Sequence, residues 1–525
     1  MLNNLLRGVI KTKASILLFF LFPIFLYSFF STNFSLNFFE PHFLWKGYNY
    51  YFLAVINGQL DIPSHAIGRE ASYIGDKVYM YYGALPLLMR GLLYPFVNLE
   101  QTSIAAFSVF TFSIVGQSFL QYSLLLKFKQ SITNQTSTAV LVGFIVLSIL
   151  LWFGSATFII LQNSTLYHEP YAASLCLTNI FLGLLVKDHF FLGNNRKVNL
   201  VPYAIVSALC LHARMPTALA LYCVMVFLLL VQIFKYSKNS ATPRFQLSAF
   251  IIHGFKSYYL TLFILFIGGV SILLLNYAKF NDPLAFMGPN YGYFFLEGYT
   301  ERRCNLVPQS DYASILRIIP NLVIYLTGSL DFHWSLSWHL NTGFGRKEMP
   351  VIPFGILWML PLLSFVFLLL LGVKRFSSIT FKYVLMLLAL LSIGTLFQLS
   401  YPTIAHRYSA ELWLPLAFSM IFLWSYFLHK QPTMQVKYYR LMIYSALCAA
   451  FIGVSYQFYL SFTSKYYLED GPIYKHEQHH YPQSDIDFLS NLTAEKIKAF
   501  KIEYHSNKQQ ACEKLAKKEG IPVKK

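Results

Sequence analysis

Charged residues are scarce in this chain. Only 12% of its 525 residues are Asp, Glu, Lys or Arg, whereas 56% are hydrophobic and the mean hydropathy is +0.49. A soluble domain cannot hide that much apolar surface in one core, but a bilayer about 30 Å thick accepts successive helices of about 20 apolar residues. The scarcity of charge therefore excludes an ordinary soluble domain and indicates a multi-pass membrane protein.

Cysteines are also few and scattered. None of the six forms a CxxC pair, and at least half of them fall inside apolar runs. We therefore expect neither a disulfide framework nor a structural zinc site. The histidine cluster KHEQHH (475–480) lacks spaced carboxylates, so the sequence assigns no metal ligands. It identifies no certain cofactor and leaves open whether a divalent metal takes part.

Eleven long apolar runs predict an all-α polytopic membrane fold. The expected spans are at about 14–31, 103–126, 136–158, 170–187, 199–213, 216–234, 257–276, 351–373, 380–399, 411–428 and 441–460. The N-terminal stretch MLNNLLRGVIKTK is basic and lacks a small-residue cleavage site, which favours a cytoplasmic flank over a cleaved signal peptide. An odd number of spans then places the C-terminus outside.

Acidic residues are nearly missing from one set of connecting segments. The N-terminus and the segments that should share its side hold 18 of the 41 Lys and Arg residues but a single acid, Asp188, of 23. The positive-inside rule assigns this side to the cytoplasm of an inner or plasma membrane. The net charge of +18 does not indicate nucleic-acid binding, because the basic residues are spread over short juxtamembrane loops and a Lys-rich tail.

Three predicted outer segments are too long to be simple connectors. They cover about 32–102, 277–350 and 461–525. The first two contain candidate interfacial helices at 79–96 and 311–330, and the third is expected to form a small soluble segment. The chain thus divides into a transmembrane domain (1–460) and a C-terminal outer segment (461–525), with function expected in the outer segments.

Short motifs recur at the predicted outer ends of the spans. The first outer loop contains Glu40-Pro41-His42-Phe43, followed by NGQLDIP (57–63) and GREASYIGDKVYMYYGALPLL (68–88). The later motifs are TLYHEPYAAS (165–174), LCLHARMPTALAL (209–221), YAKFNDPLAFMGPNYGY (277–293) and AHRYSAELWLP (405–415).

This succession resembles the GT-C superfamily of membrane glycosyltransferases, which includes protein O-mannosyltransferases and the aminoarabinose transferase of lipid A. In those proteins an acid-containing stretch follows the first span, and a short helix ends in a G-x-L turn. A Y-x-Y-x-G-x-x-P segment then leads into a second interfacial helix. The present chain differs in having no tight Asp-Glu or Asp-x-Asp pair after its first span.

The resemblance implies an inverting transfer of a sugar from a polyprenyl-phosphate donor to an acceptor on the outer (periplasmic or lumenal) face. Such a reaction needs a carboxylate base for the acceptor hydroxyl and cations for the departing phosphate. Arginine suits a phosphate because its planar fork holds two oxygens at once. The implied partners are the lipid-linked sugar, membrane lipid and an acceptor (glycan, lipid or protein) that the sequence does not identify; no nucleic acid is expected.

Three acids are candidate catalytic bases: Glu40, Glu169 and Glu70. Glu40 is slightly favoured because the resembling families keep their acid in the first outer loop. The candidates for substrate binding share a predicted position at the outer mouths of the spans; they are His42, Asp76, Tyr82, His168, Arg214, Arg407 and Tyr408. Further acids and cations available on this side are Asp61, Arg69, Lys77, Arg302 and Arg303.

Most of these residues also have a structural interpretation. Glu40 and His42 could simply mark the end of a helix at the interface, and Glu169 before Pro170 is a normal helix start. Arg407 could extend its guanidinium to lipid headgroups. Arg214 lies between two short apolar runs, where a charge is costly and usually has a partner.

Two other function classes remain open from sequence. A transporter or flippase of lipid-linked sugars would place paired charges within helices near the middle of the bilayer. The predicted spans are almost free of acids, which favours the transferase. A non-catalytic assembly subunit would need no polar constellation at the outer mouths.

Overall fold

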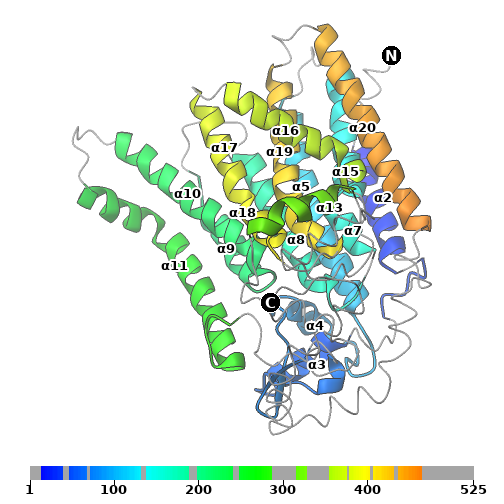
Figure 1. Ribbon diagram of the computed structural model, residues 1–525, viewed down its shortest axis with the longest axis vertical. Coiled ribbons are helices and arrows are strands. Elements are labelled where there is room, and N and C mark those ends of the chain that lie inside the picture. Colours follow the sequence, from blue (N-terminus) through cyan, green and yellow to red (C-terminus); the bar gives the residue numbers. More distant parts are fainter. Residues whose placement is uncertain are drawn as a thin grey trace, which may run out of the picture.

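The computed structural model of the protein describes residues 13–32, 34–39, 46–67, 71–131, 138–162, 164–188, 198–239, 247–285, 315–327, 354–374, 378–401, 406–430 and 436–463. The proposed C-terminal outer segment and most of the second outer loop therefore lie outside the described residues. The described chain is a bundle of helices with a small outer-loop unit packed at one end (Figure 1).

Helices occupy each of the eleven apolar runs. Their bounds are α2 (Lys13–Ser31), α5 (Ala105–Ser131), α6 (Thr138–Phe153), α8 (His168–Asp188), α9 (Val201–Leu211), α10 (Met215–Asn239), α11 (Leu247–Phe280), α16 (Met359–Lys374), α17 (Ile379–Leu391), α19 (Ser409–Lys430) and α20 (Val436–Thr463). Among the described residues, six helical stretches are long and apolar enough to cross a membrane, and shorter apolar helices accompany them. A multi-pass helical membrane protein is confirmed; the number eleven stays a prediction.

Three of the predicted spans are broken within the described part of the bundle. α6 ends at Phe153, and α7 (Ala156–Leu161) begins after Ser155, whose hydroxyl accepts the Phe158 N–H at 3.3 Å as an N-cap. Similarly, α18 (Ile393–Leu399) follows α17 across Ser392. The four-residue α15 (Phe354–Leu357) precedes α16.

The loop predicted to be the first outer one forms a compact unit of short elements. It contains α3 (Gly47–Ile56), the 3₁₀ turn η2 (Ser64–Ala66), strands β1 (Ser72–Ile74) and β2 (Lys77–Tyr79), and α4 (Leu87–Leu93). The strands pair antiparallel, with Tyr73 opposite Val78, and Gly75 takes the positive φ of +61° that the tight turn requires. This hairpin adds a small sheet that the all-α prediction did not include.

Interfacial helices were expected in both long loops, and a helix is present in each. Leu88 and Leu92 of α4 are exposed, whereas its one charged residue, Arg90, is fully buried. In the second loop, η5 (Ile315–Arg317) and α13 (Ile318–Thr327) follow the same pattern, with Ile319 exposed and Arg317 buried. Both helices thus turn apolar side chains outward and a cation inward.

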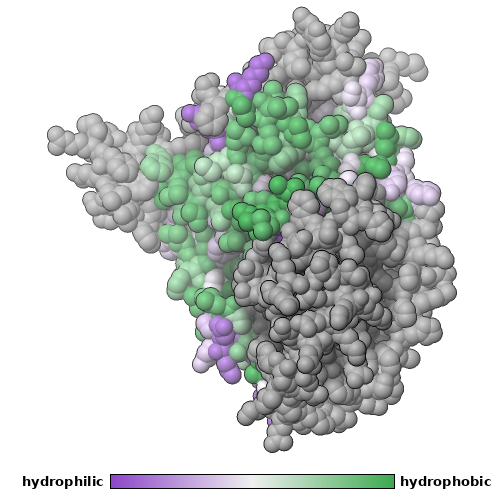
Figure 2. Space-filling model, in the orientation of Figure 1, coloured by the Kyte–Doolittle hydropathy of each residue, from purple (hydrophilic) through white to green (hydrophobic). Residues whose placement is uncertain are grey.

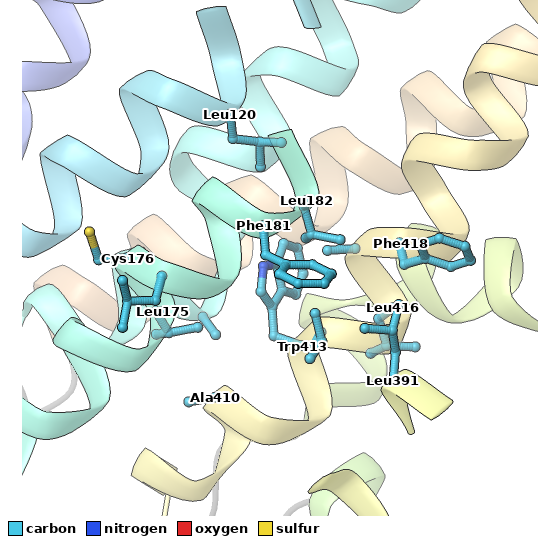
Figure 3. Packing of buried hydrophobic residues seen from close by; sticks show 14 of the residues in the cluster. Leu120, Leu175, Cys176, Phe181, Leu182, Leu391, Ala410, Trp413, Leu416 and Phe418 are labelled. Carbon is cyan, nitrogen blue, oxygen red and sulfur yellow. The ribbon is translucent and has the colours of Figure 1, made fainter. Parts of the chain in front are cut away.

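Apolar side chains of α8 and α19 belong to one hydrophobic core, which includes Phe181 and Leu182 of α8 and Trp413 of α19 (Figure 3). The Phe181 ring packs edge-on against Tyr203 of α9, and the Trp413 ring centre lies 5.2 Å from that of Trp358. Close backbone approach joins α5 to α8, because a side-chain carbon added at Gly116 would lie 2.9 Å from the Cys176 carbonyl oxygen. These contacts join α8 to its neighbours in the bundle.

The two ends of the bundle differ in chemistry. We call the end that packs against α3, α4 and the β1–β2 hairpin the loop end; α3 and α4 lie together there, beside the lower end of α11 in Figure 1. At the opposite end Asp188 accepts a hydrogen bond from Tyr203 at 3.3 Å and interacts with Lys127. Where Figure 2 colours the surface of the bundle, it is mostly hydrophobic in this view.

Candidate functional site

The segment 80–86, which links β2 to α4, lies directly on the turn between α9 and α10. The Leu85 N–H donates to the His212 carbonyl at 2.7 Å. Gly83, the glycine of the Y-x-Y-x-G-x-x-P motif, approaches the same turn so closely that an added Cβ would lie 2.6 Å from the His212 carbonyl carbon and 2.8 Å from the Ala213 carbonyl oxygen. The motif glycine therefore allows the outer loop to dock on the bundle.

Gly83→Ala is expected to lower stability by about 1–3 kcal/mol, because backbone atoms of the α9–α10 turn must move to accept the methyl group. The measurement is the thermal unfolding midpoint of the purified protein in detergent. Gly269→Ala in α11 is the matched control, since nothing lies within 4 Å of its added Cβ. An equal effect of the two substitutions would contradict the proposed close contact at Gly83.

A buried lysine of α11 also binds the segment 80–86. Lys279, near the end of α11, is 3% exposed and donates to the Met80 carbonyl at 2.9 Å. Its ammonium also lies 4.4 Å from the centre of the Tyr51 ring. The His212 ring hydrogen-bonds to Ser271 of α11 at 2.8 Å. Lys279 therefore holds segment 80–86 against α11.

Glu169, at the start of α8, forms a buried ion pair with Arg90 of α4. Both side chains are fully buried, and the guanidinium donates to both carboxylate oxygens, with Nη2 2.8 Å from Oε1. The remaining Nε–H donates to Asn49 at 3.0 Å. Asn49 in turn donates to the carbonyls of Leu99 and Thr102 at 2.8 and 2.7 Å. This bidentate network joins α3, α4 and α8.

The geometry favours the structural interpretation of Glu169. A general base needs a free oxygen within reach of the acceptor hydroxyl. Both oxygens of Glu169 already accept from Arg90, so the carboxylate holds the outer loop on the bundle.

A second charged pair lies between the α9–α10 turn and α19. The Arg214 Nε–H donates to Glu411 Oε1 at 3.0 Å, and Nη2 lies 2.9 Å from the same oxygen in an ion pair. Nη2 also donates to Gln398 Oε1 at 3.3 Å. Its central carbon lies 3.9 Å from the Tyr171 ring centre and 5.9 Å from that of Tyr408. The Glu411 side chain is fully buried, whereas that of Arg214 is 19% exposed. Arg214 thus has the partner that its position in the sequence predicts.

Arg407 and Tyr408 lie in the 3₁₀ turn η6 (His406–Tyr408), directly before α19. The Arg407 guanidinium lies 4.9 Å from the Tyr167 ring centre and 5.1 Å from that of Tyr408. Tyr167 packs edge-on against Tyr82 of the docked segment. Arg407, Tyr408, Arg214 and Tyr82 were predicted from three separate motifs, and the fold brings them together through these ring contacts.

The other predicted residues lie at the margins or outside the described residues. His168 is buried and its Nδ1 is 2.7 Å from the Thr165 hydroxyl. Asp76 is exposed in the hairpin turn, and Asp61 forms a half-exposed ion pair with Lys77 at 3.5 Å. Glu40, Glu70, His42, Arg69, Arg302 and Arg303 lie outside the residues that the structure describes.

Sequence reasoning missed the roles of Arg90, Glu411 and Lys279. Arg90 is the one charged residue of 79–96, and Glu411 is the one acid of the apolar run 411–428. A single charge in apolar surroundings is a signal that the residue needs a partner of opposite charge. Lys279 carries no comparable signal, because a lysine at the end of an apolar helix is common at a membrane interface.

No metal-ligand cluster of three His, Cys, Asp or Glu residues occurs within the described ranges. Comparisons with models of known protein families, with curated proteins and with solved structures return no match. The site must therefore be interpreted from its own chemistry.

Proposed function

We propose that the protein is a glycosyltransferase that moves a sugar from a polyprenyl phosphate to an acceptor at the loop end. The observation that carries the proposal is the group formed by Arg214, Arg407 and Tyr408 beside the docked segment 80–86. Two guanidinium groups flank one tyrosine ring at the end of an apolar bundle. Such a group has the chemistry to hold the two halves of a lipid-linked sugar at headgroup depth, with Arg407 at the phosphate and Arg214, which Glu411 already neutralises, at the sugar.

The reaction is an inverting displacement at the anomeric carbon. The acceptor oxygen forms the new bond, the bond from the anomeric carbon to the phosphate oxygen breaks, and the polyprenyl phosphate leaves with the electron pair. A carboxylate takes the acceptor proton. Glu40 and Glu70 are the candidates for this base, and Glu169 becomes less suitable because Arg90 occupies both of its oxygens.

The charge distribution supports the transferase over a flippase. The two fully or largely buried ion pairs, Arg90–Glu169 and Arg214–Glu411, both involve residues at the loop end. A flippase that moves a charged headgroup across the membrane needs polar groups along its path. Among the described residues, these ion pairs instead lie where α4 and segment 80–86 pack on the bundle.

We further propose that the loop end faces the periplasm or lumen and the Lys-rich ends face the cytoplasm. A cysteine introduced at Lys238 should be shielded from a membrane-impermeant thiol reagent in intact cells, whereas one introduced at Asp485 should react. Reaction at Lys238 with protection at Asp485 would place the candidate site on the cytoplasmic side and contradict the proposed orientation.

Arg407→Lys tests the phosphate role. Lysine keeps the charge but loses the planar fork, so transfer of the sugar should fall about tenfold or more while the protein keeps its fold. The readout is transfer from labelled lipid-linked sugars in membranes that contain equal amounts of each protein. Arg317→Lys, which alters a buried cation of η5, is the control. If the Arg407→Lys variant transferred sugar at the wild-type rate, the proposed phosphate role would be wrong and Arg407 would serve only as an interfacial anchor.

A further inference from the structure

Three buried polar atoms around Arg214 have no hydrogen-bond partner in the described part of the chain. They are Oε2 of Glu411, Nε2 of Gln398 and the hydroxyl of Tyr171. The three residues are 2%, 3% and 1% exposed. Buried polar groups are nearly always hydrogen-bonded, and one that is not calls for an explanation such as a bound water or ligand.

These atoms belong to side chains that all contact one guanidinium. Arg214 bonds to Glu411 and Gln398, and its plane covers the Tyr171 ring. The three partners come from α19, α18 and α8, which pack against one another or against α10. A ligand group that reached the partly exposed Arg214 guanidinium would therefore lie next to all three side chains.

The chemistry of the group matches a neutral hydroxylated ligand better than a phosphate. Glu411 already balances the charge of Arg214, and its second oxygen would repel an anion. The group offers a carboxylate that accepts, an amide that donates and a phenol that does either. A sugar hydroxyl both donates and accepts, so it can satisfy such a set.

We propose that Arg214, Glu411, Gln398 and Tyr171 form a subsite for the hydroxyl groups of a neutral sugar, with the phosphate on the Arg407 side of Tyr408. The subsite rests on the proposed function, because it assigns the sugar half of the lipid-linked donor. Tyr408 lies within ring-contact distance of both arginines, which makes the two halves adjacent. Arg214 then holds the subsite together and does not bind the leaving phosphate.

The test compares binding of undecaprenyl phosphate with binding of undecaprenyl phosphates that carry neutral hexoses and pentoses. The full-length protein in nanodiscs should bind at least one glycosylated lipid about tenfold or more tightly than the bare lipid phosphate. Gln398→Leu removes the free amide donor while leaving the Arg214–Glu411 pair. It should reduce this gain to about threefold or less, with unchanged affinity for the bare lipid phosphate.

Gln457→Leu is the matched control. Gln457 lies in α20, is fully buried, and both of its amide atoms are likewise without a partner within the described ranges. Its substitution should leave the gain unchanged. A wild-type protein that binds bare and glycosylated lipids equally, or a gain that survives Gln398→Leu, would overturn the subsite alone. Failure of the wild-type protein to bind either kind of lipid would overturn the proposed function and the subsite together.

Discussion

Arg90→Met is expected to destabilise the protein by about 3–5 kcal/mol. The substitution leaves the Glu169 carboxylate fully buried without a counter-charge, and it also removes the Nε–H bond to Asn49. We expect the purified protein to unfold at a clearly lower temperature in detergent, and the yield from membranes to fall. The effect should be visible without any assay of activity.

The double variant Arg90→Met/Glu169→Met separates the ion pair from its packing. Replacing both charges with apolar side chains removes the unpaired anion, so most of the lost stability should return. Glu169→Gln, which keeps a hydrogen-bond acceptor for Arg90, should be mild in both stability and transfer. If Arg90→Met were stable and Glu169→Gln abolished transfer at normal yield, Glu169 would be the base and the structural interpretation would be wrong.

Glu40→Gln is expected to lower transfer by about 10²-fold or more if this residue is the base. Glutamine keeps the size and hydrogen-bonding capacity, so folding and binding of the lipid-linked donor should persist. The described residues on either side of Glu40 belong to the loop end: Phe39 stacks on Phe107 near the start of α5, and Lys46 donates to the Glu100 carbonyl at 2.9 Å.

Glu70→Gln is the comparison for this prediction, since it tests the second candidate base in the same loop. A large loss in Glu70→Gln with a mild effect of Glu40→Gln would reassign the base. Full activity of Glu40→Gln, Glu70→Gln and Glu169→Gln, each at normal yield, would contradict the enzyme assignment as a whole.

The helices were predictable because their signal is local. Each apolar run is long enough to be recognised by composition alone, and each is helical in the structure. The breaks at Gly154–Ser155, Trp358 and Ser392 were missed, since the hydropathy of the flanking residues continues across them. The β1–β2 hairpin was missed because its strands are only three residues long.

The partners within the site were not predictable from one sequence. Arg214 was expected to have a counter-charge, but Glu411 lies 197 residues further along the chain. Likewise, the ordinary helix-start pattern of Glu169 contains no sign of Arg90, 79 residues earlier. Long-range pairs of this kind depend on how the helices pack, and the sequence pattern reports only which single residues are unusual for their surroundings.

The fate of a sugar-labelled lipid in proteoliposomes tests the central claim most directly. Purified protein would be reconstituted with undecaprenyl-phosphate-linked sugars and a membrane extract as the source of acceptors. The account predicts that label leaves the lipid and bare undecaprenyl phosphate accumulates, and that Arg407→Lys slows both. Intact labelled lipid that only changes leaflet, with no release of bare lipid phosphate, would contradict the transferase and favour a flippase.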